Sequence, residues 1–556
     1  MRPHHSTEAA IATIAMKVTS TIVLATLAAA SCVHIASDHA MSFCESQINE
    51  GILRAHVEFL GSDQLGGRGV GTEGDVLARN YIASQLRAAG CQPGAADGSW
   101  MQPVPILGIK SNVTKSLQAT GSEGTSSFAA PTDYTAVAGS PDANAEWNDA
   151  EVVFVGYGID APEQSWDDFQ GVDVRGKVLM VMNNDPSDDP DLFAGNTRLY
   201  YGRWSYKFEE AARRGAAGVM IIHTNKSAGY PFQVIQSSHG RENFWLPFEA
   251  DKPTLAVRSW CSEQAAETMC KLGGHSLDEL RARAEKGNQA PVSLGVTVAL
   301  SIQNDLREIQ SANVVGVLPG TDPQLKDEYV VLTAHFDHLG IGKPRGKDAI
   351  YNGAVDNASG CSGMLTLARA AALLPNRRRS MLFLAVTAEE SGLLGSKYYA
   401  EHPTVDTKKL VANVNVDGLN VWGPTKDIEF IGYGKNSLSD VATKIAEARG
   451  RKICPDSQPD LGLFYRSDHF NFARIGVPAA FFKGGKEFLD QPANRKRMKA
   501  SYTTVHYHQP TDQLAKWWNF EGAVDDMRVL FSLLIDTANA DDAPTWTAGD
   551  EFEKLR

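Results

Sequence analysis

Apolar and polar positions follow two distinct patterns along the second half of the chain. Largely apolar runs, typical of buried strands, lie at 329–334, 381–386, 410–416 and 477–482, and a further strand is predicted at 427–432. Apolar residues at helical spacing lie at 362–374, 393–399, 438–449 and 522–538. Strands that are apolar throughout are buried on both faces, and their alternation with helices is typical of parallel sheets. We therefore predict an α/β domain over 305–540, whose mixed, mostly parallel central sheet is covered by helices on both faces.

The first half of the chain carries two further patterns. Residues 43–90 have near-helical spacing of apolar residues, interrupted by a glycine-rich loop. Beyond residue 112, short strand patterns alternate with turns and one helix, at 151–158, 176–182, 207–215 and 217–223. This order predicts a smaller α/β module inserted into the larger domain. The predicted limits are 43–111 for the N-terminal part of the larger domain, 112–304 for the insert, 305–540 for the rest of the larger domain and 541–556 for a C-terminal tail.

Length and charge narrow the class of protein. A chain of 556 residues is too long for one ordinary core and predicts two or three domains. Hydrophobic residues make up 43% of the chain, as in soluble globular proteins. The net charge of −13 predicts no nucleic-acid partner, because phosphate binding needs a basic surface.

The N-terminus has the pattern of an export signal. Lys17 precedes an apolar run at 18–30, which is too short to span a membrane but suits a signal peptide. The run ends in Ala28-Ala29-Ala30, a possible cleavage site, and Ala30-Ser31-Cys32 resembles a bacterial lipoprotein site with Cys32 as the lipidated residue. We predict a signal peptide over 1–31 and an exported protein that is periplasmic, secreted or lipid-anchored, with no transmembrane helix in the mature chain.

Acidic and histidine side chains follow three of the predicted strands directly. They are His335, Asp337, Glu389, Glu390 and Asp417. Asp356 lies in a loop bracketed by Gly353 and Gly360, just before a predicted helix. Ligands collect beyond the carboxyl ends of strands in such sheets, and clustered carboxylates repel one another unless a cation compensates them. Imidazole and carboxylate are ligands that suit zinc.

These stretches, with a later one, resemble the di-zinc aminopeptidase family of peptidase clan MH, whose relatives include glutamate carboxypeptidase, glutaminyl cyclase and the transferrin receptor. The motifs are His335-Phe-Asp337-His338, Gly353 to Gly360, Thr387 to Gly392, Asn415-Val-Asp417-Gly418 and Tyr507-His508-Gln-Pro-Thr-Asp512. The resemblance covers about 311–540. It implies a zinc exopeptidase fold, two Zn²⁺ per chain and removal of the N-terminal residue from peptides with a free N-terminus.

The resemblance also implies a role for each residue. Asp356 would bridge the two ions, with His335 and Asp417 completing one site and Glu390 and His508 the other; His506 competes with His508 for that position. Glu389 would be the general base for an activated water. Asp337 would orient the imidazole of His335. Tyr465 or His469, in a Ser-Asp-His segment common in the family, are candidates to stabilise the carbonyl oxygen, although helix capping by Ser467 and Asp468 explains that segment equally well.

The insert resembles the protease-associated domain found within many exopeptidases. The similarity rests on Asp173-Val-Arg-Gly-Lys177-Val and on the segment from Ala211 to Val219. Three other functions stay open. A glutamate carboxypeptidase-like enzyme or dipeptidase would need basic residues for substrate carboxylates, which only the run at 495–499 supplies near these motifs. A glutaminyl cyclase would usually employ one zinc. A receptor-like binding protein would keep the fold without the chemistry.

Overall fold

The computed structural model describes residues 39–556 except 187, 188, 190, 191, 240 and 250. The predicted signal peptide, its alternative cleavage sites and Cys32 lie outside the described residues. Over the described part of the chain, no helix has both the length and the apolar character that a membrane crossing requires.

A mixed, mostly parallel sheet forms the centre of the larger lobe, which confirms the predicted fold class. Its strands run in the order β19-β18-β20-β17-β13-β16. They are β13 (Tyr329–His335), β16 (Ser380–Val386), β17 (Leu410–Val416), β18 (Asp427–Ile431), β19 (Lys452–Pro455) and β20 (Ala479–Gly484). β13 is parallel to both neighbours and β17 is parallel to β20, whereas β18 is antiparallel to β20. The carboxyl ends of β13, β16, β17 and β20 therefore meet at one edge.

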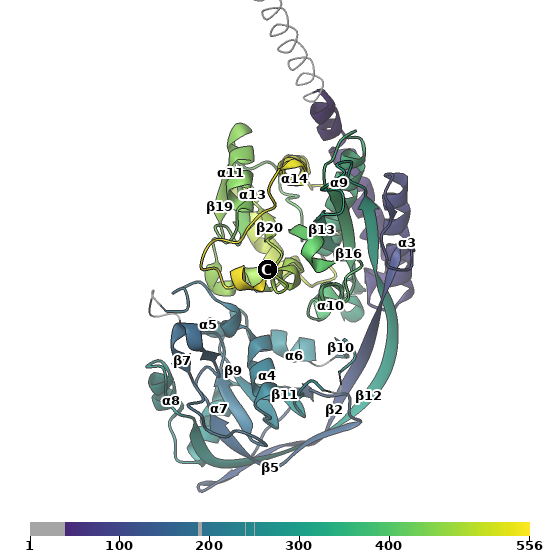
Figure 1. The fold of residues 1–556 in the computed structure, drawn as a ribbon. Helices are drawn as coiled ribbons and strands as arrows, with labels where there is room; N and C mark the ends of the chain where they lie inside the picture. Colours follow the sequence, from purple (N-terminus) through teal and green to yellow (C-terminus); the bar gives the residue numbers. More distant parts are fainter. Residues whose placement is uncertain (1–38, 187–188, 190–191, 240, 250) are drawn as a thin grey trace, which may run out of the picture.

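Helices bury both faces of this sheet (Figure 1). One face packs against α2 (Glu50–Leu60), α3 (Glu73–Ala88), α9 (Gly360–Ala372) and α14 (Glu521–Asn539). The other packs against α10 (Leu394–Glu401) and α12 (His469–Ala473). Neighbouring residues of β13 divide between the two cores: Leu332 belongs to the first, and Val331 packs with Tyr399 and Phe472 in the second. This two-sided burial explains why β13 and β16 are mostly apolar on both faces.

Two long strands connect the larger lobe to a second one (Figure 1). β2 (Met101–Gly121) and β12 (Val292–Leu318) are antiparallel over most of their length. The end of β12 pairs with β16, and its beginning pairs with β5 (Asn144–Phe154). The second lobe continues through β8 (Val178–Met182), β9 (Gly218–His223), β11 (Val257–Ser262) and β4 (Tyr134–Ala138), with α4 (Trp204–Arg213), α7 (Glu263–Leu272) and α8 (Leu277–Ala284). The long strands cross the predicted limits at 112 and 304. Those limits, and the likeness to a protease-associated domain, stay predictions.

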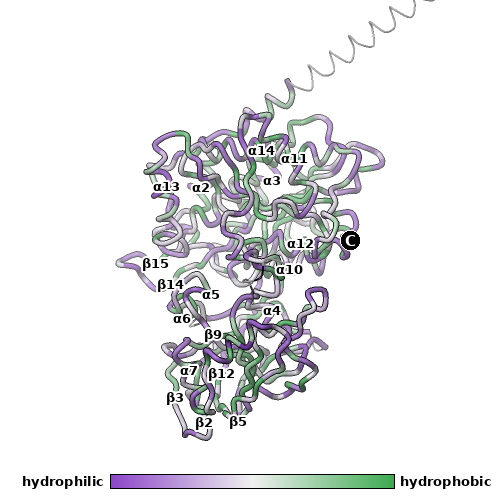
Figure 2. The backbone as a smooth tube through the Cα atoms, turned by 90° about the vertical axis from the view of Figure 1, so that its left-hand side faces the viewer, coloured by the Kyte–Doolittle hydropathy of each residue, from purple (hydrophilic) through white to green (hydrophobic). Residues whose placement is uncertain are grey.

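A hairpin of β14 (Gly340–Arg345) and β15 (Asp348–Tyr351) projects from the larger lobe and is hydrophilic at its tip (Figure 2). Its base lies against the 3-10 segment Asp63–Arg68. Gly67 in that segment has φ of 70°, and a Cβ there would lie 2.4 Å from the carbonyl oxygen of Tyr351. Only glycine permits this close approach. The contact brings the adjacent Arg68 under the loop that begins at Gly353.

Candidate metal centre

The acidic and histidine residues singled out in the sequence gather at the carboxyl edge of the central sheet. His335 is the last residue of β13, and Asp417 directly follows β17. Glu389 and Glu390 lie on a short 3-10 turn after β16. Within the described residues, two groups of three potential metal ligands have ligand atoms within 4.8 Å of one another: His335 with Glu389 and Asp417, and His338 with Asp356 and Glu390.

Asp356 lies between two histidines. Its Oδ1 atom is 3.3 Å from Nε2 of His335, and its Oδ2 atom is 3.2 Å from Nε2 of His508. The same nitrogen of His335 is 3.5 Å from Oδ1 of Asp417, and that of His508 is 3.1 Å from Oε2 of Glu390. Each oxygen of one carboxylate thus belongs to a different imidazole–carboxylate group, which is the arrangement that a bridging ligand of two ions requires.

The donor atoms fit a pair of zinc ions. Nε2 of His335 and Nε2 of His508 are buried, and neither makes a hydrogen bond of good geometry within the described residues. Buried polar atoms are rarely left without a partner, and these two nitrogens both face the carboxylate of Asp356, so they are suited to bind a cation. Imidazole nitrogen and carboxylate oxygen are the donors of catalytic zinc sites.

Burial and the charges of neighbouring side chains shift the pKa values of the residues at this site. Burial disfavours the charged form of His335, but Glu389, Asp356 and Asp417 together raise its pKa well above the usual value. Burial also opposes the ionised form of Asp356, yet the imidazoles of His335 and His508 that face it hold its pKa well below normal. Burial, with Asp468, Asp417 and Glu390, raises the pKa of Glu389 well above normal despite His335. The cluster therefore carries an excess of buried carboxylates, which a cation would stabilise.

Asp337 acts on the loop that carries the two glutamates. Its Oδ1 accepts a hydrogen bond from the backbone N–H of Glu389 at 3.0 Å, and its Oδ2 accepts one from Glu390 at 3.4 Å. Nδ1 of His335 lies 3.2 Å from the backbone carbonyl oxygen of Asp337 and 3.8 Å from its carboxylate. The carboxylate of Asp337 thus positions Glu389 and Glu390, and its main chain is the nearer partner of the His335 imidazole.

Asp512 holds the segment that carries Asp356. Its two carboxylate oxygens accept hydrogen bonds from the backbone N–H groups of Val355 and Asp356 at 3.0 and 3.1 Å. The hydroxyl of Tyr502 donates a third bond at 3.1 Å. On the far side of Asp356, the Asn357 amide oxygen accepts from the backbone N–H of Gly418 at 2.9 Å. Asp356 is thereby fixed from both sides.

Two further supports come from distant parts of the chain. The Ser467 hydroxyl donates to Oδ2 of Asp417 at 2.7 Å and accepts from the Asn415 amide, so Ser467 orients a candidate ligand and caps no helix.

Arg68 is fully buried. Its guanidinium donates to the carbonyl oxygens of Phe336, Asn352 and Gly353 at 2.7, 2.6 and 2.9 Å. It therefore ties the segment after His335 to the loop before Asp356.

The remaining candidates lie as follows. The hydroxyl of Tyr465 donates to Glu551 at 2.6 Å, and Tyr465 packs among aromatic residues. The ring of His469 lies against Phe464 and Phe481, and burial lowers the pKa of His469 to about 3. No contact joins Tyr465 or His469 to the carboxylate cluster within the described residues.

Nδ1 of His506 faces the Thr511 carbonyl oxygen at 3.1 Å. His338, by contrast, joins the cluster, with Nδ1 2.6 Å from Oε1 of Glu390.

Comparison with known proteins finds a similarity for part of the larger lobe. Residues 313–527, less than half of the chain, match the profile of Peptidase family M28. Aminopeptidase YwaD of Bacillus subtilis (strain 168) is 30% identical over 206 residues, which are 37% of this chain and 40% of that protein. A glutamate carboxypeptidase 2 homolog of Caenorhabditis elegans is 29% identical over 238 residues, 38% of this chain and 29% of that protein. The chain thus aligns with 40% or less of either relative's length.

A solved structure extends the likeness to the whole fold. The aminopeptidase from Aneurinibacillus sp. strain AM-1 aligns with 90% of this chain and 96% of its own, at a TM-score of 0.51 and 18% sequence identity. At this identity the comparison establishes a similar fold. Because the aligned part is 90% of the chain, the similar fold extends to the second lobe. That lobe lies outside the peptidase family match at residues 313–527.

Proposed function

We propose that this protein is a di-zinc aminopeptidase that hydrolyses the N-terminal residue from peptides. The observation that carries the proposal is the position of Asp356, whose two carboxylate oxygens face the imidazoles of His335 and His508 at 3.3 and 3.2 Å. Asp417 would complete the site of His335, and Glu390 would complete that of His508. Bound there, zinc supplies Lewis-acid chemistry: it polarises a carbonyl group and lowers the pKa of water to about 7.

Glu389 is the proposed general base. Its Oε2 atom lies 3.9 Å from Nε2 of His335. Because burial and the neighbouring carboxylates raise the pKa of Glu389, it is a stronger base than an exposed glutamate. It would take the proton of the attacking water on a carboxylate oxygen and deliver it to the nitrogen of the leaving amine. The backbone N–H groups of Glu389 and Glu390 donate to the carboxylate of Asp337, which holds this turn and the Glu389 side chain in place.

The proposal is tested with amino-acid anilides and their N-acetylated counterparts, alongside the measured zinc content. An aminopeptidase hydrolyses the free-amino anilide, loses that activity on N-acetylation and on exhaustive chelation, and recovers when zinc is returned. Activity that survives chelation would sink the metal mechanism. Equal hydrolysis of blocked and free substrates would exclude an aminopeptidase. One zinc per chain together with cyclisation of N-terminal glutamine would favour a glutaminyl cyclase instead.

Export and the identity of the second lobe are proposed with it. The N-terminal pattern supports a signal peptide over 1–31, and the motifs after residue 173 support a protease-associated domain over 112–304. Mass spectrometry of the mature N-terminus distinguishes the two processing sites. A lipid mass on Cys32 supports a membrane-anchored form, and an unmodified N-terminus after Ala30 supports a secreted or periplasmic one.

A further inference from the structure

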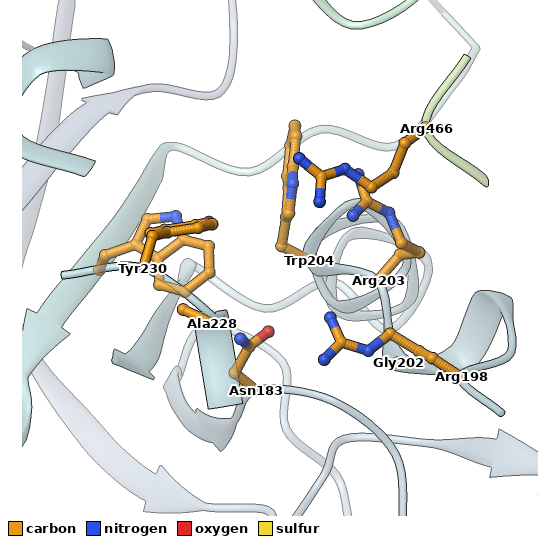
Figure 3. Close-up of a pocket in the computed structure, with 9 residues that line it drawn as sticks. Asn183, Arg198, Gly202, Arg203, Trp204, Ala228, Tyr230 and Arg466 are labelled. Atoms are coloured by element: carbon orange, nitrogen blue, oxygen red, sulfur yellow. The ribbon is translucent and has the colours of Figure 1, made fainter. Parts of the chain in front are cut away.

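Three arginines converge on a small cavity between the two lobes. The cavity has a volume of about 60 Å³ and is lined by Asn183, Arg198, Gly202, Arg203, Trp204, Ala228, Tyr230, Trp260 and Arg466. Figure 3 shows the guanidinium groups of Arg203 and Arg466 beside the ring of Trp204, with Arg198 extending toward Asn183. Arg198 and Arg203 belong to the second lobe, whereas Arg466 comes from the segment before α12 in the larger lobe.

These positive charges are not neutralised by direct ion pairs within the described residues. Among the described residues, none of the three guanidinium groups forms an ion pair, and no acidic residue lines the cavity. Nε of Arg203 is buried without a hydrogen-bond partner. Burial, with Arg466 and Arg198, lowers the pKa of Arg203 to about 9. Clustered like charges are costly where they are partly buried, as Arg198 and Arg203 are, unless an anion completes them.

The nearby charged groups do not supply that anion. Asp185 and Asp460 act on Arg198 through space, but Asp185 already accepts a hydrogen bond from the backbone N–H of Leu199 at 2.8 Å. Tyr230 faces both arginines of the second lobe, and the charge of buried Lys207 is offset by Asp185 and Asp168. The charged side chains that line the cavity itself are Arg198, Arg203 and Arg466.

One residue that lines the cavity, Arg466, is adjacent in the sequence to a residue of the candidate metal centre. Arg466 precedes Ser467, whose hydroxyl donates to Asp417 at 2.7 Å. Arg466 also acts electrostatically on Tyr507, whose ring stacks on His508 at 3.9 Å. The backbone N–H of Arg198 donates to the Pro459 carbonyl oxygen at 3.1 Å, which holds the two lobes together beside the cavity.

We propose that this arginine cavity binds a carboxylate group of the peptide substrate, an inference that rests on the proposed peptidase function. A guanidinium group presents paired N–H donors that match a carboxylate. A carboxylate has three heavy atoms, and a water-sized group needs roughly 10–15 Å³, so the volume suffices. The carboxylate comes either from the C-terminus of a short peptide or from an acidic side chain. The enzyme would accordingly prefer short or acidic peptides.

Paired substrates test the proposal. Trialanine is compared with trialanine amide, and Ala-Glu-amide with Ala-Gln-amide, in the wild type and in Arg203→Gln and Arg466→Gln. Loss of a charged hydrogen bond is expected to lower kcat/KM for the carboxylate member of a pair about 10- to 100-fold and to leave its neutral partner unchanged. A drop confined to trialanine identifies the C-terminal carboxylate, and a drop confined to Ala-Glu-amide identifies the side chain.

Three controls separate the possible outcomes. Leucine anilide, which has no carboxylate, reports the proposed peptidase function alone and should be hydrolysed equally by all variants. Arg175→Gln removes the same charge from an exposed site on the same lobe, where Arg175 pairs with Asp173, and should behave as the wild type. Arg466, which is exposed, provides a test that does not depend on the folding of an Arg203 variant. Unchanged acid-to-neutral ratios in both variants would overturn the proposal. A wild type without activity on any of these substrates would overturn the peptidase function and this inference with it.

Discussion

Asp512 provides the most direct test of how the metal centre is held. Its carboxylate accepts hydrogen bonds from the backbone N–H groups of Val355 and Asp356 and from the hydroxyl of Tyr502, at 3.0–3.1 Å. Asp512→Asn keeps the shape but turns an N–H₂ group toward at least one of these donors. Each charged hydrogen bond lost costs about 1.5–3 kcal/mol. Because the lost bonds position Asp356, part of this cost should appear as weaker metal binding.

The expected fall in zinc affinity is about 10- to 100-fold, the range typical of residues that orient metal ligands. This corresponds to about 1.4–2.7 kcal/mol, the same scale as one charged hydrogen bond. The assay is competition with a chromophoric chelator, accompanied by thermal unfolding of the metal-free protein.

A matched control separates positioning from general destabilisation. Asp427 on β18 is also buried. Its carboxylate accepts hydrogen bonds from the backbone N–H groups of Lys486 at 3.0 Å and Glu487 at 2.8 Å, and none of its hydrogen bonds within the described residues involves a candidate ligand. Asp427→Asn should lower the unfolding temperature and leave zinc affinity within about twofold of the wild type. Equal losses of zinc affinity in both variants, or none in Asp512→Asn, would refute the reasoning.

Two further substitutions test the proposed roles. Glu389→Gln removes the proposed base and keeps the side-chain volume, so kcat should fall by about 10²- to 10⁴-fold while zinc content measured by atomic absorption stays at the wild-type level; a variant that keeps its activity would remove Glu389 from the mechanism. His508→Ala should lose one of two zinc ions, whereas His506→Ala should keep both, because only His508 faces Asp356 and Glu390, at 3.2 and 3.1 Å. The opposite stoichiometry in the two histidine variants would identify His506 as the ligand.

The sequence predicted the central sheet well because its strands are buried on both faces. β17 has the bounds that its apolar run predicted, Leu410–Val416, and Asp417 follows it directly. His335 and Glu389 could be singled out for the same reason, since strand ends are visible as the ends of apolar runs. The two long strands were missed, although apolar residues alternate along β12 at 292, 294, 296, 298, 300 and 302. Strict alternation of this kind indicates a strand with one buried face.

The supports of the candidate site could not be predicted in the same way. Arg68 contacts carbonyl oxygens of residues up to 285 positions away, and Asp512 holds a backbone 157 positions before it. Backbone groups are present at every residue, so a side chain that binds them leaves no pattern in the sequence of its partner. The arginine cavity was hidden for a related reason: Arg198, Arg203 and Arg466 come together only when the two lobes pack. The basic run at 495–499, which the sequence offered instead, lies on a separate helix, α13 (Pro492–Ser501).

The spread of these residues along the chain has a consequence for biosynthesis. The carboxylate of Asp356 is held by Asp512, and one of its two imidazole partners is His508. In the proposed di-zinc enzyme, almost the whole chain must therefore be synthesised before the second metal position can form. An ion bound earlier would meet His335 and Asp417 without His508. The proposal thus implies that tight binding of both ions is a late event, and that a chain truncated before residue 508 binds metal weakly.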